Sequence, residues 1–254
     1  MLVSQSSSPR NYRAVLFDAF RTLIEVGVHA PMMRVDEPTW RSAMSRVFAA
    51  LVPEHPDFGT ERLLDSFEAV TRELAATRRQ SQREVPLAYR YELTFRRLGW
   101  SERDIRTLAD RAVQVHRAAI ATHCRVSPEA SRIVHYCRSL GMRVGVVSNF
   151  DDAASVNAVL EKDHLHQQLD IVVVSADVGW RKPHPAIFQR ALAGLGVMPK
   201  ESLFVGDSFE EDVRGPRSIG MDAAWLVPGE PPEEQRLEAT FCLSQLSDLL
   251  PVLR

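Results

Sequence analysis

Lysine, cysteine and long apolar runs are scarce in this sequence of 254 residues. Only three of its 31 basic residues are lysines (Lys162, Lys182 and Lys200), which makes the position of each one informative. The three cysteines show no metal-ligand spacing, so the sequence favours a reduced, cytoplasmic protein without disulfides or a zinc site. No apolar run is long enough to cross a bilayer, and the Ser-rich residues 1–10 are interpreted as a loose N-terminal tail rather than a secretory signal.

An excess of charge of either sign is also absent. The formal net charge at pH 7 is −2, which gives no electrostatic reason to expect nucleic acid or an anionic membrane as the main partner. Hydrophobic residues make up 45% of the chain, enough for a core in one large domain or two small ones. We therefore expect a globular protein whose main partner is neither nucleic acid nor a membrane, and we expect it to be a monomer or a homodimer.

From about residue 127 onward, short apolar runs alternate with amphipathic stretches, which predicts β-α units and a parallel sheet. Strands are expected at 143–148, 170–175, 202–206 and 223–227, and helices at 128–140, 152–161, 185–195 and 210–219. Glycines that follow three of these helices fit the left-handed cap conformation. Right-handed crossovers then bring the carboxyl ends of the strands to one edge of the sheet, where ligands of open α/β folds bind.

The segment 25–125 has a different pattern, with almost no β-branched runs. It is expected to form helices at 39–51, 60–79, 86–98 and 101–123. The sequence therefore predicts an α/β protein whose Rossmann-like core of about five parallel strands is formed by residues 11–24 and 126–254. An α-helical unit, residues 25–125, is inserted after the first strand.

Polar side chains stand at the ends of predicted strands and, in one case, before the start of a predicted helix. They are Asp18, Ser148 with Asn149, Lys182 before Pro183, and Asp207 with Asp212 behind it. Each signal is weak alone, because a strand-end Asp, a Ser-Asn pair or a Gly-Asp pair is common in turns and helix caps, and a lysine is usually a surface charge. Their joint order and their placement on one predicted edge favour a single site.

A carboxylate attacks phosphorus well only if its own charge and that of the phosphate are offset by cations and fixed donors. Asp18 is the candidate nucleophile, and Asp207 would hold Mg²⁺ with it, since hard cations prefer carboxylate oxygens. Asp212 would complete or orient that set of ligands. Lys182 would balance the excess negative charge, with Asp18 and Asp207 as its expected partners.

Hydrogen-bond donors for a phosphate are expected at the same edge. The hydroxyl of Ser148 and the amides of Asn149 and Phe150 are candidates, and Thr22 would donate another hydrogen bond. Glu210 and Glu211 are interpreted as solvated residues near a helix start, where the helix dipole favours acidic side chains.

This order of motifs resembles the haloacid dehalogenase-like (HAD) superfamily, and the segment 127–227 is most similar to its HDHD-type phosphatase-like members. The resemblance implies that residues 25–125 form a mobile cap, joined to the core near 24–26 and 125–127. It also implies that the backbone carbonyl of Phe20 helps to bind Mg²⁺, and that a small phosphate ester is cleaved through an aspartyl-phosphate at Asp18.

One residue departs from this pattern. Phe20 stands where the phosphatases of the superfamily carry a second aspartate, which protonates the leaving oxygen and activates the hydrolytic water. Loss of a positioned acid/base typically costs about 10²–10⁴-fold in rate. The sequence favours a metal-dependent phosphatase that is slow, is specialised for a good leaving group, or uses an acid from the cap.

The sequence leaves three alternatives to this phosphatase. Asp18-Ala19-Phe20 also resembles 2-haloacid dehalogenases, although those enzymes work without a metal and usually have serine where Asp207 stands. Arg21 departs from both groups, which usually have glycine there. Phosphonate cleavage through a cap lysine is disfavoured because residues 1–161 contain no lysine. The third alternative is a non-catalytic member that serves as a binding module.

Overall fold

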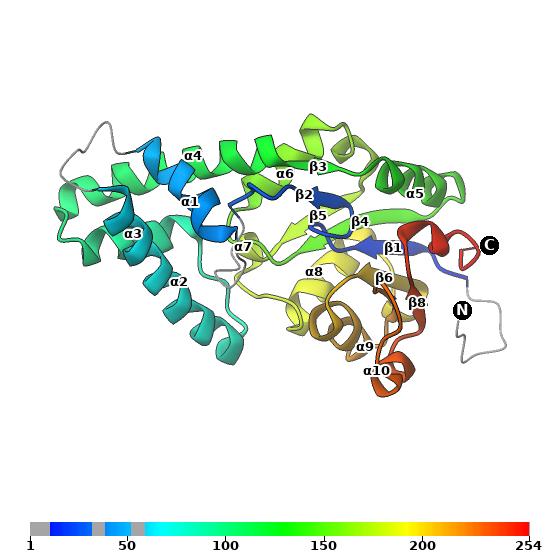
Figure 1. Ribbon diagram of the computed structural model, residues 1–254. Coiled ribbons are helices and arrows are strands. Elements are labelled where there is room, and N and C mark those ends of the chain that lie inside the picture. Colours follow the sequence, from blue (N-terminus) through cyan, green and yellow to red (C-terminus); the bar gives the residue numbers. More distant parts are fainter. Residues whose placement is uncertain (1–10, 32–38, 52–58, 254) are drawn as a thin grey trace.

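The computed structural model describes residues 11–31, 39–51 and 59–253, so the prediction of a loose tail at 1–10 lies outside the described residues. The described chain has an α/β fold. In Figure 1 a parallel sheet with its covering helices lies to the right, and a lobe of helices lies to the left. None of the helices in the described ranges combines the length and the hydropathy of a membrane span.

The main sheet of the described chain has six strands in the order β5-β4-β1-β6-β7-β8, all parallel. Their bounds are Ala14–Phe17 (β1), Arg143–Ser148 (β4), Ile171–Val174 (β5), Ser202–Gly206 (β6), Asp222–Leu226 (β7) and Phe241–Leu243 (β8). The predicted strands between 143 and 227 are confirmed. The prediction of about five strands missed β8, because a three-residue strand carries too little periodicity to be recognised.

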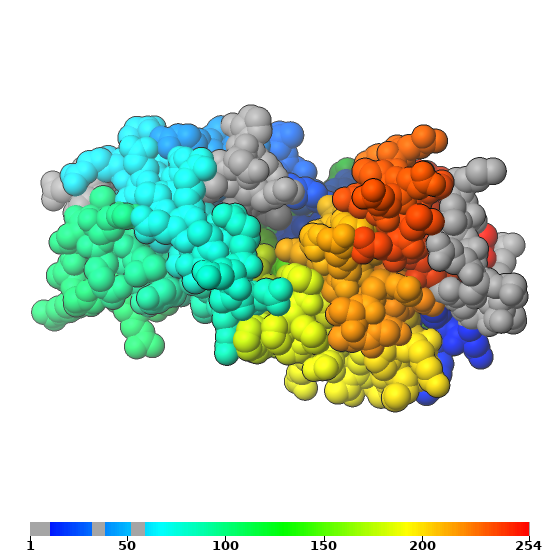
Figure 2. Space-filling view, turned by 90° about the horizontal axis from the view of Figure 1, so that it is seen from below, coloured from blue at the N-terminus to red at the C-terminus, as the bar shows by residue number. Residues whose placement is uncertain are grey.

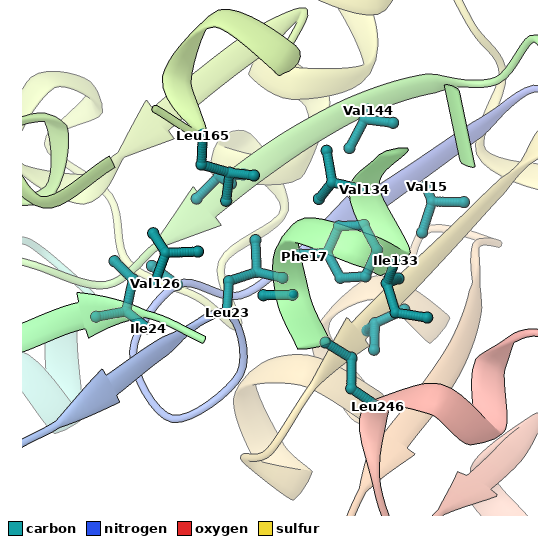
Figure 3. Close-up of a cluster of buried hydrophobic side chains, with 14 of the residues drawn as sticks. Val15, Phe17, Leu23, Ile24, Val126, Ile133, Val134, Val144, Leu165 and Leu246 are labelled. Atoms are coloured by element: carbon teal, nitrogen blue, oxygen red, sulfur yellow. The ribbon is translucent and has the colours of Figure 1, made fainter. Parts of the chain in front are cut away.

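β1 lies in the middle of the sheet, and all four of its residues are buried. Phe17, its last residue, is in register with Val146 of β4 and Val205 of β6. Figure 3 shows how Val15 and Phe17 pack against apolar residues of the helix α5 (Pro128–Ser139), including Ile133 and Val134. The residues that follow these neighbouring strands therefore meet at one edge, as the sequence predicts.

The helices of the core separate the strands. They are α5 Pro128–Ser139, α6 Ala153–Lys162, α7 Ser175–Val178, α8 Pro185–Leu195, α9 Gly215–Arg217 and α10 Glu233–Glu238, with 3₁₀ turns at His166–Gln168, Pro199–Glu201 and Leu246–Leu249. The prediction of one regular helix over 210–219 is wrong. A π-helical segment, Phe209–Arg214, is followed by the short α9 instead. Pro216 has no N–H and cannot donate the i→i−4 hydrogen bond of a regular helix, which interrupts the ladder at this point.

The helical lobe contains α1 Trp40–Ala49, α2 Thr60–Ser81, α3 Leu87–Arg97 and α4 Glu102–His123, close to the predicted ranges. Its apolar core is separate from that of the sheet and includes Phe48, Phe67 and Tyr91. An antiparallel pair of short strands, β2 Ile24–Val26 and β3 Cys124–Val126, joins the lobe to the core. This ribbon lies where the sequence predicts the two connections.

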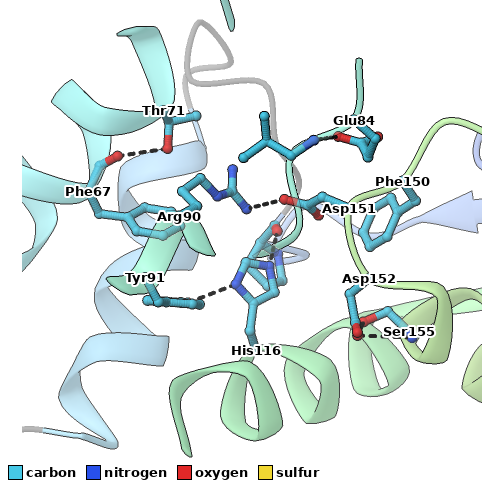
Figure 4. A network of polar contacts seen from close by, with 12 residues as sticks. Phe67, Thr71, Glu84, Arg90, Tyr91, His116, Phe150, Asp151, Asp152 and Ser155 are labelled. Carbon is cyan, nitrogen blue, oxygen red and sulfur yellow. Dashed lines mark hydrogen bonds and ion pairs between the residues drawn. The ribbon is translucent and has the colours of Figure 1, made fainter. Parts of the chain in front are cut away.

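A buried group of charged residues lies where the helical lobe contacts the core (Figure 4). Arg90 of α3 is fully buried, and its Nη2 lies 2.9 Å from Oδ2 of Asp151, which belongs to the loop after β4. Arg78 of α2 pairs with Glu84 at 3.1 Å and reaches Asp151 at 3.5 Å. The backbone N–H of Leu87 also donates to the carbonyl of Asp151. The lobe is thus attached to the core at a second place besides the ribbon.

Candidate active site

Asp18 and Lys182 form a buried ion pair at the carboxyl edge of the sheet. Asp18 follows β1, and its N–H donates to the carbonyl of Val205 on β6, which continues the ladder into the site. Nζ of Lys182 donates to Oδ1 of Asp18 at 2.6 Å and to Oδ1 of Asp212 at 2.7 Å. The expectation that Asp207 is the second partner of Lys182 is therefore wrong, and Asp212 takes that place.

The protonation of this pair follows from burial and from neighbouring charges. Burial raises the pKa of Asp18 to about 7, against the opposing effect of the Lys182 ammonium. Burial lowers the pKa of Lys182, but the carboxylates of Asp18 and Asp212 outweigh it and raise that pKa overall, so Lys182 stays charged. Burial, together with Asp212, also raises the pKa of Asp207. Three carboxyl groups around one ammonium leave an excess of negative charge that a divalent cation would offset.

The carboxylates can hold such a cation. Asp18, Asp207 and Asp212 each offer an oxygen, and these atoms lie within 4.8 Å of one another. An all-carboxylate set suits a hard ion such as Mg²⁺. Gly206 permits this arrangement, since a Cβ there would lie 2.4 Å from the carboxylate of Asp212. The three carboxylates that the sequence assigns to the metal are thus brought together. Phe20 stands two residues after Asp18, and the centroid of its ring lies 4.7 Å from that of Phe150.

A cavity of about 310 Å³ opens in front of Asp18. Its lining residues are Asp18, Phe20, Arg21, Ser148, Asn149, Phe150, Arg181, Asp207, Ser208 and Glu211. Ser148 ends β4 and is almost completely buried, so its hydroxyl faces a confined space. The side chain of Asn149 forms two hydrogen bonds with the backbone of Lys182, from Nδ2 to the carbonyl at 2.9 Å and from the amide to Oδ1 at 2.7 Å. Asn149 thereby fixes the loop that carries the lysine.

Two groups that the sequence predicts as phosphate donors, the hydroxyl of Thr22 and the amide of Phe150, are not free donors on the cavity wall. Thr22 is buried but is not among the residues that line the cavity, and its hydroxyl has no hydrogen-bond partner within the described part of the chain. The amide of Phe150 donates to Oγ of Ser175 at 2.9 Å, so it is already used inside the protein. Ser148 and Asn149, which both line the cavity, stay as candidate phosphate donors.

The structure adds two residues to the site, Glu211 and Arg181, that the sequence does not predict there. Glu210, the neighbour of Glu211, is exposed and pairs with Arg214, as expected of a solvated residue. The same expectation for Glu211 is wrong, because Glu211 lines the cavity and burial raises its pKa. Arg181, immediately before Lys182, also lines the cavity. In the sequence, Glu211 precedes Asp212 and Arg181 precedes Lys182, which is the only local sign that these residues belong to the site. The π-helical turn and the loop before Lys182 then bring their side chains to the cavity.

Chemically, the site presents a carboxylate beside a permanent positive charge, two further carboxylates that can bind a cation, and the hydroxyl of Ser148 on the same cavity. This combination suits nucleophilic attack by Asp18 on an electrophile whose charge needs compensation. The aromatic pair of Phe20 and Phe150 forms an apolar wall of the same cavity. No proton donor is present at position 20.

The chain resembles several known proteins. A family model described as haloacid dehalogenase-like hydrolase matches residues 60–226. Haloacid dehalogenase-like hydrolase domain-containing protein 3 of Bos taurus is 33% identical over 156 residues, which cover 59% of this chain and 61% of that protein. Glyceraldehyde 3-phosphate phosphatase of Pyrococcus furiosus is 27% identical over 168 residues, which cover 65% of this chain and 69% of that protein. The chain thus spans about three fifths of the length of the bovine relative.

The fold also matches solved structures. The crystal structure of a 2-haloacid dehalogenase from Pseudomonas syringae pv. Tomato superposes with a TM-score of 0.72, over 95% of this chain and 98% of that one. The two sequences are 22% identical, so this likeness concerns the fold alone. It extends over both the sheet and the helical lobe.

Proposed function

Because the chain belongs to the haloacid dehalogenase-like hydrolase family, we propose that it is a Mg²⁺-dependent phosphatase that acts on a small phosphorylated metabolite. The observation that carries this proposal is the contact of Asp18 with Lys182, next to two further carboxylates that are close enough to share a cation. A relative named glyceraldehyde 3-phosphate phosphatase supports the choice of a phosphate ester. The helical lobe would act as a cap over the site.

In the proposed reaction, the carboxylate of Asp18 attacks phosphorus, and the bond from phosphorus to the ester oxygen breaks. The product is an aspartyl-phosphate at Asp18 and a free alkoxide or phenoxide. Lys182 keeps its proton throughout and favours the ionised form of Asp18, against the burial that raises the pKa of this carboxyl to about 7. The hydroxyl of Ser148 and the backbone amide of Asn149, two residues that line the cavity, donate to phosphate oxygens. Water then hydrolyses the aspartyl-phosphate.

The carboxylates of Asp18, Asp207 and Asp212, with the backbone carbonyl of Phe20, would hold Mg²⁺, which when bound offsets the negative charges of the phosphate and the nucleophile. Phe20 has no proton to give to the departing oxygen. The proposal therefore favours substrates whose leaving group has a low pKa, such as aryl or acyl phosphates. We also propose that the protein is cytoplasmic, and the three free cysteines among the described residues support this location, because thiols stay reduced there.

A second candidate is halide removal from a 2-haloacid. Phe20 and Phe150 favour it, because they form an apolar wall beside Asp18 and a halide leaves without a proton. Asp207 and Asp212 argue against it, since the metal-independent reaction needs no such cluster of carboxylates. A catalytically impaired protein that only binds a ligand is the third candidate.

One assay separates the three. Purified protein is given 4-nitrophenyl phosphate and, separately, 2-chloropropionate, each with and without EDTA. We expect phosphate release at a modest rate, abolished by EDTA and by Asp18→Asn, and restored by Mg²⁺ in the parent but not in Asp207→Ala. The exposed Asp110→Asn on α4 is the matched control and should behave like the parent. Metal-independent halide release would support the dehalogenase instead, and neither activity would support a binding protein.

A further inference from the structure

A second cavity adjoins the one in front of Asp18. Its volume is about 580 Å³, and it lies between α2 of the helical lobe and the core segment that carries Lys182. Figure 2 shows this junction from below, with the cyan α2 beside the yellow and orange core. Arg181 and Glu211 line both cavities, so these two residues form the boundary between them. The second cavity is the larger of the two.

Arg181 is held in place from the helical lobe. Its Nη1 pairs with Oε2 of Glu84, whose side chain is 1% exposed. Glu84 is fixed in turn by Oγ of Ser175 and by Nε of Arg78 at 3.1 Å. Few rotamers are therefore open to the Arg181 side chain, and a guanidinium that is fixed in advance loses little entropy when it binds an anion.

The backbone of the same two segments is also paired. The N–H of Arg181 donates to the carbonyl of Gln82 at 2.9 Å, and the N–H of Glu84 donates to the carbonyl of Gly179 at 3.1 Å. Arg83 lies over the ring of Trp180 at 3.6 Å. The loop after α2 and the loop before Lys182 thus form one unit that fixes Arg181 at the boundary of the two cavities.

The chemistry of Arg181 suits an anion. A guanidinium presents five N–H donors in a planar fork that matches a carboxylate or a phosphate. The second cavity also has Arg79 and Arg78 of α2 on its lining, opposite Glu210 and Glu211. A substrate whose phosphate lies at Asp18 would extend its leaving group past Arg181 into this space.

We propose that the second cavity binds the leaving group of the substrate, and that this group carries a second negative charge bound by Arg181. Glu84 is the positioning residue that holds Arg181. This inference rests on the proposed function and narrows the substrate to small phosphate esters whose leaving group is itself acidic.

The test uses ligands that cannot be hydrolysed, so that it does not depend on turnover. Calorimetry in the presence of Mg²⁺ compares phenylphosphonate with 3-carboxyphenylphosphonate. The parent should bind the carboxylated ligand about tenfold more tightly than phenylphosphonate, and Arg181→Gln should lower this ratio of affinities to about one. Equal affinity of the parent for the two ligands would overturn the inference.

Two further variants separate positioning from general damage to the fold. Glu84→Gln should weaken only the binding of the carboxylated ligand, and Glu84→Asp should restore part of the preference, because the carboxylate returns. Ala75→Phe should fill the second cavity and lower the affinity for both ligands. Ala76→Phe changes an exposed neighbour that does not line the cavity, and should lower neither affinity. A loss of the same size for both ligands in Glu84→Gln would contradict its positioning role.

Failure of the anion subsite can be distinguished from failure of the proposed phosphatase activity. Hydrolysis of 3-carboxyphenyl phosphate by the parent, measured in parallel, tests the phosphatase activity. If the parent prefers the carboxylated phosphonate but does not cleave the ester, the anion subsite stands and the phosphatase proposal fails. If the parent cleaves 3-carboxyphenyl phosphate and 4-nitrophenyl phosphate with equal KM, and Arg181→Gln changes neither KM, the phosphatase proposal stands and the subsite fails.

Discussion

At the scale of single residues, positions 20 and 21 separate this chain from the phosphatases that it resembles. The ring of Phe20 is almost completely buried against Phe150, so an acid is replaced by an apolar side chain and not by another polar group. Arg21 has a φ of 68°, in the left-handed region that glycine adopts without steric cost. The backbone there still has the conformation that suits the glycine usual in the family.

This backbone makes a restored acid feasible. Phe20→Asp combined with Arg21→Gly should raise turnover of an alkyl phosphate by at least about 10²-fold, and that of 4-nitrophenyl phosphate far less, because an alkoxide needs a proton and a nitrophenolate does not. Steady-state and single-turnover kinetics on both esters measure the difference. Arg21→Gly alone is the control and should give no such gain. A folded double variant that gains on neither ester would mean that more than the acid is missing.

At the scale of helices and strands, α3 and α4 are joined by a buried polar contact that predicts a pH effect (Figure 4). Nε2 of His116 lies 2.7 Å from the carbonyl of Pro31, which can only accept, so the neutral ring donates there and accepts from the Tyr91 hydroxyl at Nδ1. Burial, with the nearby charge of Arg90, lowers the pKa of His116 to about 3. The folded protein thus keeps this histidine neutral in mild acid.

The sign of the effect follows from proton binding. The unfolded chain protonates the histidine near pH 6.5, whereas the folded protein does so only near pH 3, so the unfolded state binds more protons between these values and stability falls as pH falls below 6.5. Between pH 7.5 and pH 5, His116 should cost about 2 kcal/mol in the free energy of unfolding. Urea unfolding should show this loss reduced by about that amount in His116→Gln, and unchanged in the exposed His135→Gln on α5. An equal loss in all three proteins would disprove the assignment.

At the scale of the whole molecule, the attachment of the helical lobe limits how a cap could move. The antiparallel ribbon alone would permit a hinge, but Arg90, Arg78 and Asp151 form a second, buried attachment. Removal of one partner from a buried ion pair typically costs about 3–5 kcal/mol, because the other charge is left buried without compensation. We therefore propose that any opening of the cap turns about both attachments rather than about the ribbon alone.

Hydrogen exchange can test this second attachment. Arg90→Met should accelerate exchange of the Leu87 amide, which donates to the carbonyl of Asp151, and should lower the free energy of unfolding by about 3 kcal/mol or more. Arg97→Met, which breaks the exposed pair of Arg97 with Glu73, should change stability by less than about 1 kcal/mol and leave that amide unaffected. Unchanged exchange at Leu87 in Arg90→Met would show that the ion pair does not fasten the lobe.

The sequence by itself determined the order of the elements and the edge at which the site lies. Apolar runs that end on Asp18, Ser148 and Gly206 predict parallel strands, and parallel strands bring their carboxyl ends together whatever the details of packing. The single helix predicted over 210–219 is not formed, because Pro216 cannot continue the hydrogen-bond ladder of a regular helix.

Only the tertiary structure decided which of the neighbouring polar groups touch. Lys182 pairs with Asp212 and not Asp207, because the π-helical turn brings Asp212 back over Gly206. The pairs Arg90 with Asp151 and Arg181 with Glu84 join the lobe to the core. Glu84 and Arg181 are 97 residues apart, and no local pattern encodes such a contact. Periodicity reports which face of an element is buried, whereas the partner of a buried charge depends on how separate elements pack.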